Sequence, residues 1–344
     1  MSKKIKLNNT LSKRKHNDVF LNEIIELLEN NSITDDNNEK ESLLEDLIEK
    51  IKNYKDISSI INDKPIAFSK IQYKHLYEIK EKIGWDIPRD LHDLKFFNIS
   101  PIILPKNMIN DCLKEINEKI YYIGIISDLD NEAKKKYFID IFVDKCISFF
   151  KGEIINDIEG YISNALYNGR IEYILKSFTN TIIVIIEAKK DIEYQQNYGQ
   201  IMTELYAVYE TNKKQNNFID KVYGVLTTSE SWIWWCYDGK TYFVSQEPTI
   251  LRRNNPKSIP IVLSTLFNII YIGWKSVIKK YINQKINDEL KNQLLEELKE
   301  SENLLNNKNI KAFDIIENII NVINSNNSEF KDIFLWEVDY NYLN

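Results

Sequence analysis

The middle of the chain switches between helical and strand-like patterns of apolar residues. Behind Asn131, apolar side chains recur at steps of three and four residues up to residue 150, which predicts a helix. A second helical segment covers residues 193–210. Short apolar runs, with Asp238-Gly239 as a hairpin turn, predict strands over residues 154–161, 169–175, 181–189, 222–227, 232–235 and 241–244. The order helix, three strands, helix, strand predicts an α/β fold with a mixed sheet.

Helical patterns flank this middle region on both sides. The predicted organisation is a basic, disordered tail (1–17), a helical N-terminal region (18–122), the α/β core (123–250) and a helical C-terminal region (259–344). The N-terminal region includes helices over 19–28 and 43–51. Proline and glycine residues then break it into short helices at Pro65, Gly84, Pro88, Pro101 and Pro105. In the C-terminal region, helices are predicted over residues 261–282, 287–305 and 310–323.

Composition and charge narrow the class of protein. Of the 344 residues, 43% are hydrophobic, which is enough for a packed core, and the net charge of -6 argues against a generally basic nucleic-acid-binding surface. Cys112, Cys146 and Cys236 lack the spacing of a zinc site, so we interpret them as reduced thiols in the core. Without a signal-peptide pattern or an uninterrupted membrane-length apolar run, we expect an intracellular protein, cytoplasmic or nuclear, with no membrane partner.

Candidate chemistry gathers where two predicted strands meet. Glu187 and Lys189 end the very apolar run 181–189, and period-two alternation puts both side chains on one face of that strand. If the run 169–175 pairs with it as a hairpin, Glu172 reaches the same face. Two carboxylates can hold a hard divalent cation such as Mg²⁺, and a lysine beside them can orient water or stabilise developing negative charge. These groups suffice for metal-assisted hydrolysis of a phosphodiester.

Five segments in order resemble the PD-(D/E)xK nuclease superfamily, and more narrowly the nuclease-like domain of Crinkler-type and related fungal and oomycete proteins. The resemblance spans about residues 128–248. The matching segments are Asn131-Glu132-Ala133, Ile171-Glu172-Tyr173-Ile174, Glu187-Ala188-Lys189-Lys190, the helix with Gln196 and Gln200, and Lys221 to Thr227 with Trp232. It implies a restriction-endonuclease-like core with α-β-β-β-α-β order, helical extensions, and a partner nucleic acid, with DNA favoured over RNA.

The resemblance also assigns roles within the site. Glu132, Glu172 and Glu187 would bind Mg²⁺ or Mn²⁺, while Glu172, Glu187, Lys189 and Gln200 would carry catalysis. Glu172 stands where the family normally has aspartate, so its carboxylate lies one methylene further out. Because Mg²⁺ demands near-ideal geometry, we predict weak activity that prefers Mn²⁺.

Other interpretations remain open. A non-cleaving nucleic-acid-binding module, or a protein-interaction or effector protein that uses its helical flanks, would also suit the sequence. Glu132 would then be a first-turn acid favoured by the helix dipole, and Gln200 part of a solvated helix face. We interpret the run Lys134-Lys135-Lys136 as a solvated face, with the border of a phosphate-binding cleft as the alternative. Core packing is favoured over base stacking for three tryptophans, Trp232, Trp234 and Trp235.

Overall fold

The computed structural model describes residues 65–326 except 127, 128, 130, 165, 218, 253, 254 and 256. All but the first two belong to a compact unit that begins at Ala67. The predicted basic tail and the helices over 19–28 and 43–51 lie outside the described residues.

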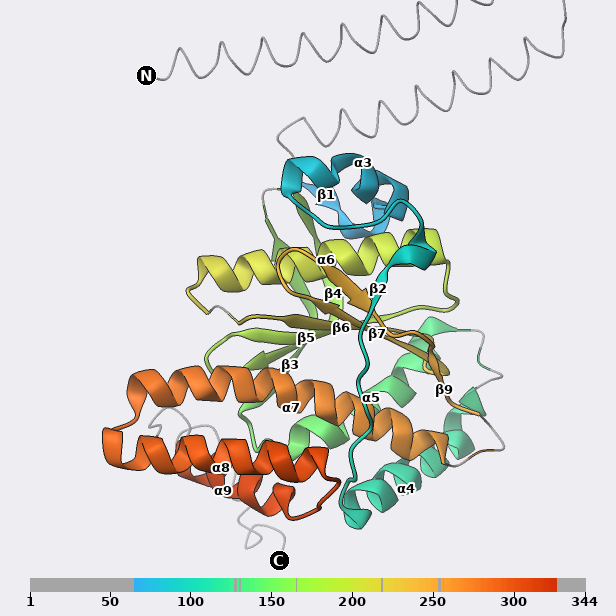
Figure 1. The fold of residues 1–344 in the computed structure, drawn as a ribbon. Coiled ribbons are helices and arrows are strands. Elements are labelled where there is room, and N and C mark those ends of the chain that lie inside the picture. The colour runs from blue at the N-terminus through green and yellow to red at the C-terminus, as the bar shows by residue number, and fades with distance from the viewer. Residues whose placement is uncertain are drawn as a thin grey trace, which may run out of the picture. The chain divides into compact units, whose positions relative to one another are not determined.

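A mixed β-sheet forms the centre of this unit (Figure 1). Its strand order runs β4-β5-β6-β7-β8-β2, with β3 paired to β4 and β9 paired to β7. The β5–β6 and β2–β8 pairs are parallel, and the other pairs named here are antiparallel. The strands are β2 (Lys95–Phe96), β3 (Ile154–Ser163), β4 (Tyr167–Ser177), β5 (Ile182–Ala188), β6 (Val222–Thr227), β7 (Ser231–Tyr237), β8 (Tyr242–Val244) and β9 (Thr249–Ile250), preceded by β1 (Ile66–Ala67).

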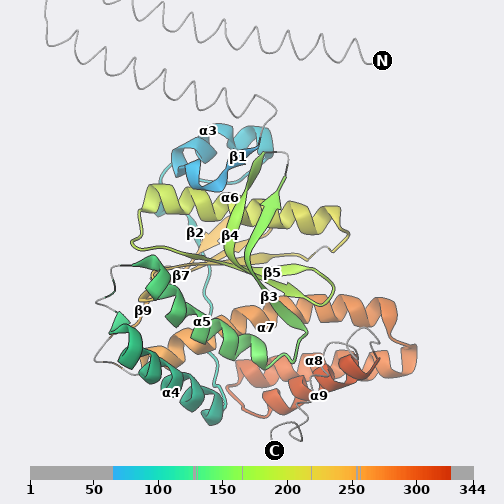
Figure 2. The same cartoon turned by 180° about the vertical axis from the view of Figure 1, so that it is seen from behind.

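Helices cover both faces of the sheet, so the predicted α/β class is confirmed. Helix α6 (Tyr194–Lys214) lies on one face, with α3 (Tyr73–Ile83) beyond it (Figures 1 and 2). The other face carries α5 (Glu132–Ser148) and α7 (Ser258–Lys285). Outside these lie α4 (Lys106–Ile123), α8 (Asp288–Asn306) and α9 (Ala312–Asn326). Two short 3₁₀ helices, η1 (Phe68–Lys70) and η2 (Leu91–Asp93), complete the described elements.

The apolar patterns explain why these elements form the core. Every residue of β5 is buried, as expected for a strand covered on both faces. Trp232, Trp234 and Trp235 on β7 are at most 2% exposed, which confirms the core-packing interpretation. All three cysteines are free and buried, as predicted.

Helix α7 is long and apolar enough to cross a membrane by length and composition, which makes it the one such helix among the described residues. However, 72% of its most apolar window is buried inside the protein, as in a core helix. Gly273 explains how closely it packs: a Cβ built there would lie 2.9 Å from Cβ of Ile183 on β5. The helix therefore serves as the apolar cover of the central strand.

The region before the core differs from its prediction. Instead of only short helices, it contains α4, which runs for 18 residues from just after Pro105. The predicted break at Gly84 is confirmed, since this residue ends α3 with a φ of 81°. Strands β2 and β9 were not predicted, because two-residue strands are too short to show period-two alternation.

Candidate active site

The strand pairing brings the two predicted carboxylates to one place. Strands β4 and β5 are antiparallel, with Tyr173 opposite Ile186 and Ile174 opposite Ile185. The next step in this register sets Glu172 opposite Glu187. Residues that face each other across an antiparallel pair project to the same side of the sheet. The hairpin geometry on which the sequence argument depended is therefore present.

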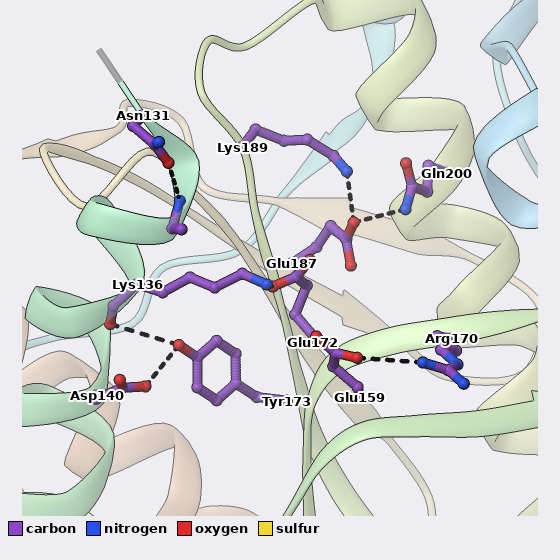
Figure 3. A network of polar contacts seen from close by, with 11 residues as sticks. Asn131, Lys136, Asp140, Glu159, Arg170, Glu172, Tyr173, Glu187, Lys189 and Gln200 are labelled. Carbon is purple, nitrogen blue, oxygen red and sulfur yellow. Dashed lines mark hydrogen bonds and ion pairs between the residues drawn. The ribbon is translucent and has the colours of Figure 1, made fainter. Parts of the chain in front are cut away.

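Glu187 is the centre of the polar cluster (Figure 3). Its side chain is only 4% exposed. Oε1 accepts a hydrogen bond from Lys189 Nζ at 2.5 Å and another from Gln200 Nε2 at 2.6 Å. Oε2 is buried and has no hydrogen-bond partner among the described residues. One oxygen is thus held by two donors, while the other remains available as a ligand.

Burial and mutual attraction together set the pKa values of Glu187 and Lys189. Burial dominates for Glu187. It raises the pKa of Glu187 to about 7, although the charge of Lys189 and its hydrogen bond act in the opposite direction. For Lys189, burial lowers the pKa, but the charge and hydrogen bond of Glu187 outweigh it and the net pKa is raised. Lys189 is therefore a cation at neutral pH, suited to donate hydrogen bonds and to stabilise negative charge rather than to act as a base.

Gln200 links Glu187 to a third carboxylate that the sequence analysis missed. Gln200 Nε2 also donates to Glu204 Oε1 at 2.8 Å. Glu204 is fully buried, and burial followed by the charge of Glu187 raises its pKa well above the usual range. The available signal was its position four residues after Gln200, on the same helix face and among apolar residues.

Glu172 has a partner from another element. Lys136 on α5 reaches across to it and forms an ion pair, in which the side chains are 26% and 18% exposed (Figure 3). Burial lowers the pKa of Lys136, but the hydrogen bond and charge of Glu172 outweigh this effect, and Glu132 adds to the net increase. Glu132 itself is half-buried in the first turn of α5. Its negative charge also acts to raise the pKa of Lys189, so Glu132 influences the cluster through its charge.

The lysine run of α5 is not simply a solvated face. Lys135 is 8% exposed, and its Nζ donates to the backbone oxygen of Lys190 at 2.7 Å. The solvated-face interpretation is therefore wrong for this residue, because the first turns of α5 rest against the end of β5. Gln196 points elsewhere, since its amide donates to the backbone oxygen of Ser69.

The donor set fits a small, hard cation bound by few protein ligands. Mg²⁺ is commonly held by one or two carboxylates plus substrate phosphates and water. Glu187 has a buried oxygen without a hydrogen-bond partner among residues 65–326, and Glu172 lies beside it in the strand register. The described residues contain no group of three or more His, Cys, Asp or Glu side chains arranged to hold a metal ion. Glu132, Glu172 and Glu187 therefore do not form such a group of three in this structure.

Comparisons with known proteins do not assign a family. No protein-family model matches the chain, and no curated protein matches it. Among solved structures, part of the chain is similar to the cryoEM structure of a DrdV–DNA complex, with a TM-score of 0.28 and 13% sequence identity. The similarity covers 57% of this chain and 17% of that chain. A likeness this slight carries no argument about function, so the function has to be argued from the residues themselves.

Proposed function

We propose that this chain has a restriction-endonuclease-like core and acts as a metal-dependent nuclease that hydrolyses phosphodiester bonds, with DNA favoured over RNA. The observation that carries the proposal is the convergence of Glu187, Lys189 and Gln200 at the end of a fully buried strand, with Glu172 opposite. Burying ionisable groups is costly unless they are paired, hydrogen-bonded or bound to a metal ion. Groups with perturbed pKa values cluster at functional sites, which supports a functional role for these residues.

Each residue has a distinct part in the proposed chemistry. Glu172 and Glu187 would hold Mg²⁺ or Mn²⁺, which, when bound, stabilises charge on the scissile phosphate and lowers the pKa of a coordinated water. Lys189 donates hydrogen bonds to the attacking water or to the developing negative charge. Gln200 fixes the orientation of the Glu187 carboxylate through its hydrogen bond of 2.6 Å. The negative charge of Glu132 acts to raise the pKa of Lys136 and of Lys189.

Cleavage of supercoiled plasmid tests the proposal. Wild-type protein is incubated with Mg²⁺, Mn²⁺ or a chelator, beside Glu187→Ala and Lys189→Ala, with single-stranded DNA and RNA as further substrates. Lys190→Ala is the matched control, because Lys190 is adjacent and exposed. We expect cleavage by wild type and Lys190→Ala, no cleavage by the two site variants, and loss of activity with the chelator. Equal activity in wild type and both site variants would show a contaminating nuclease and remove the proposal's support.

A second candidate is a nucleic-acid-binding module that does not cleave. It is favoured by the pairing of both carboxylates with lysines, Glu172 with Lys136 and Glu187 with Lys189, since an internally neutralised cluster has no need of a cation. Gel-shift binding that persists in Mn²⁺, without cleavage, would favour this candidate.

A further inference from the structure

Lys136 occupies an unusual position beside the candidate site. It is a flexible, charged side chain from α5, yet it pairs with the one carboxylate of β4 that faces Glu187. The charges that act on it come from three elements: Glu172 on β4, Glu132 on its own helix, and Glu159 on β3. The ion pair with Glu172 therefore holds the charged end of Lys136 against the sheet.

Three contacts fix the first half of α5, so the location of Lys136 is built into the fold. Asn131 Oδ1 caps the helix by accepting a hydrogen bond from the backbone N–H of Ala133 at 2.8 Å. The buried Lys135 tethers the same turn to the backbone after β5. Tyr173, next to Glu172 on β4, donates its hydroxyl to Asp140 Oδ1 on α5 at 2.7 Å. The helix therefore cannot move away from Glu172 easily, whereas the four-carbon stem of Lys136 can swing.

The charge balance indicates what such a movement does. When all four groups are ionised, the two negative charges of Glu172 and Glu187 balance the two positive charges of Lys136 and Lys189. A divalent cation added to this set repels both ammonium groups and competes with Lys136 for the same carboxylate. A phosphodiester with an attacking hydroxide brings two negative charges, which restores the balance. The side chain of Lys136 is 26% exposed, so it is accessible to a phosphate that approaches from solvent.

We propose that Lys136 is an exchangeable counter-cation: it neutralises Glu172 in the metal-free protein and moves to a substrate phosphate when a divalent cation takes its place. This inference depends on the proposed metal site at Glu172 and Glu187. Its chemistry involves only the exchange of ionic partners. Lys136 is then a substrate-binding residue, and its ion pair with Glu172 neutralises that carboxylate when no metal is bound.

Mn²⁺ binding to the nucleic-acid-free protein tests the exchange directly, by electron paramagnetic resonance of the free ion. In Lys136→Met the competitor is gone, so Mn²⁺ should bind at least about tenfold more tightly than to wild type. Lys136→Arg keeps the charge and can pair with the carboxylate through two donors, so its affinity should not exceed that of wild type. Lys134→Met removes the same charge from an exposed position of the same helix, and it should change the affinity by less than about twofold.

Substrate binding gives the second readout. Lys136→Met should weaken binding to DNA, and the slope of log affinity against log salt should fall by about one, as expected for one lost phosphate contact. Circular dichroism confirms that each variant is folded. If wild type binds Mn²⁺ through Glu187 but Lys136→Met binds it no more tightly, the exchange is wrong and the metal site stands. If neither protein binds Mn²⁺, both the exchange and the proposed function are overturned.

Discussion

Glu153 offers a sharp test of the physical reasoning, independent of any function. It directly precedes β3 and is fully buried. Its Oε2 accepts a hydrogen bond from Trp274 Nε1 on α7, and Oε1 has no hydrogen-bond partner among the described residues. Burial raises the pKa of this carboxyl from 4.5 to about 8, although the hydrogen bond from Trp274 acts to lower it. At neutral pH the native protein therefore holds Glu153 in its protonated form.

The sign of the pH dependence follows from this shift. Because the folded-state pKa is raised, the native protein binds more protons than the unfolded chain between pH 4.5 and about 8. The contribution of Glu153 is fully present below pH 4.5 and is lost as the pH rises through about 8. At about 1.4 kcal/mol per unit of pKa difference, the full loss amounts to at most about 5 kcal/mol in the free energy of unfolding.

Glu153→Gln isolates this contribution, since glutamine keeps an oxygen acceptor for Trp274 and cannot ionise. The free energy of unfolding is measured by urea titration, with tryptophan fluorescence as the signal, between about pH 5.5 and about pH 8.5. The variant minus wild-type difference should grow in favour of the variant by about 1 kcal/mol per pH unit up to about pH 8. Glu300→Gln, an exposed position on α8, is the matched control for the substitution itself. A difference for Glu153→Gln that stays constant across this range would refute the reasoning.

Three further predictions concern the site and its scaffold. Glu172→Asp should increase the initial cleavage rate with Mg²⁺ at matched metal concentration; a slower variant would show that the site is built around glutamate. Gly199→Ala should destabilise the protein by about 1–3 kcal/mol in urea unfolding, because the new Cβ would lie 2.5 Å from the backbone oxygen of Ile71, and an unchanged midpoint would contradict that packing. Asn212→Ala should cost about 1–3 kcal/mol, since Asn212 exchanges two hydrogen bonds, of 3.0 and 2.8 Å, with the buried backbone of Ile182; amide hydrogen exchange at Ile182 would report the loss, and unchanged protection there would contradict it.

The sequence was sufficient to predict the elements with strong periodicity. The run before Glu187 is apolar at every position, and it forms β5, the strand buried along its whole length. Alternation then determined that Glu187 and Lys189 share a face, and they are in contact at 2.5 Å. The catalytic and metal-binding roles of these residues remain predictions.

The contacts of two residues of the cluster, Lys136 and Glu204, were not predicted, for a physical reason. Lys136 belongs to a run of three lysines, and Glu204 is one of many glutamates. Which side of α5 or α6 faces the sheet depends on how each helix is rotated against it, and tertiary packing decides that rotation. For α5 the steps of three and four residues put Lys136 on the same face as Ile139 and Val143, but they could not show that its charge pairs with Glu172. The long stem of lysine can cover apolar surface while its charge reaches a partner elsewhere.

The contact between Gly273 and Ile183 has a consequence for the order in which the protein can be completed during synthesis. The ribosome makes β5, with Glu187 at its end, well before it makes α7, the helix that presses on that strand. Until α7 emerges, the part of the apolar sheet face that α7 covers stays exposed, the condition in which chains aggregate or recruit chaperones. A stop codon after β8 would spare every codon of the candidate site and still remove the support of the strand that carries it.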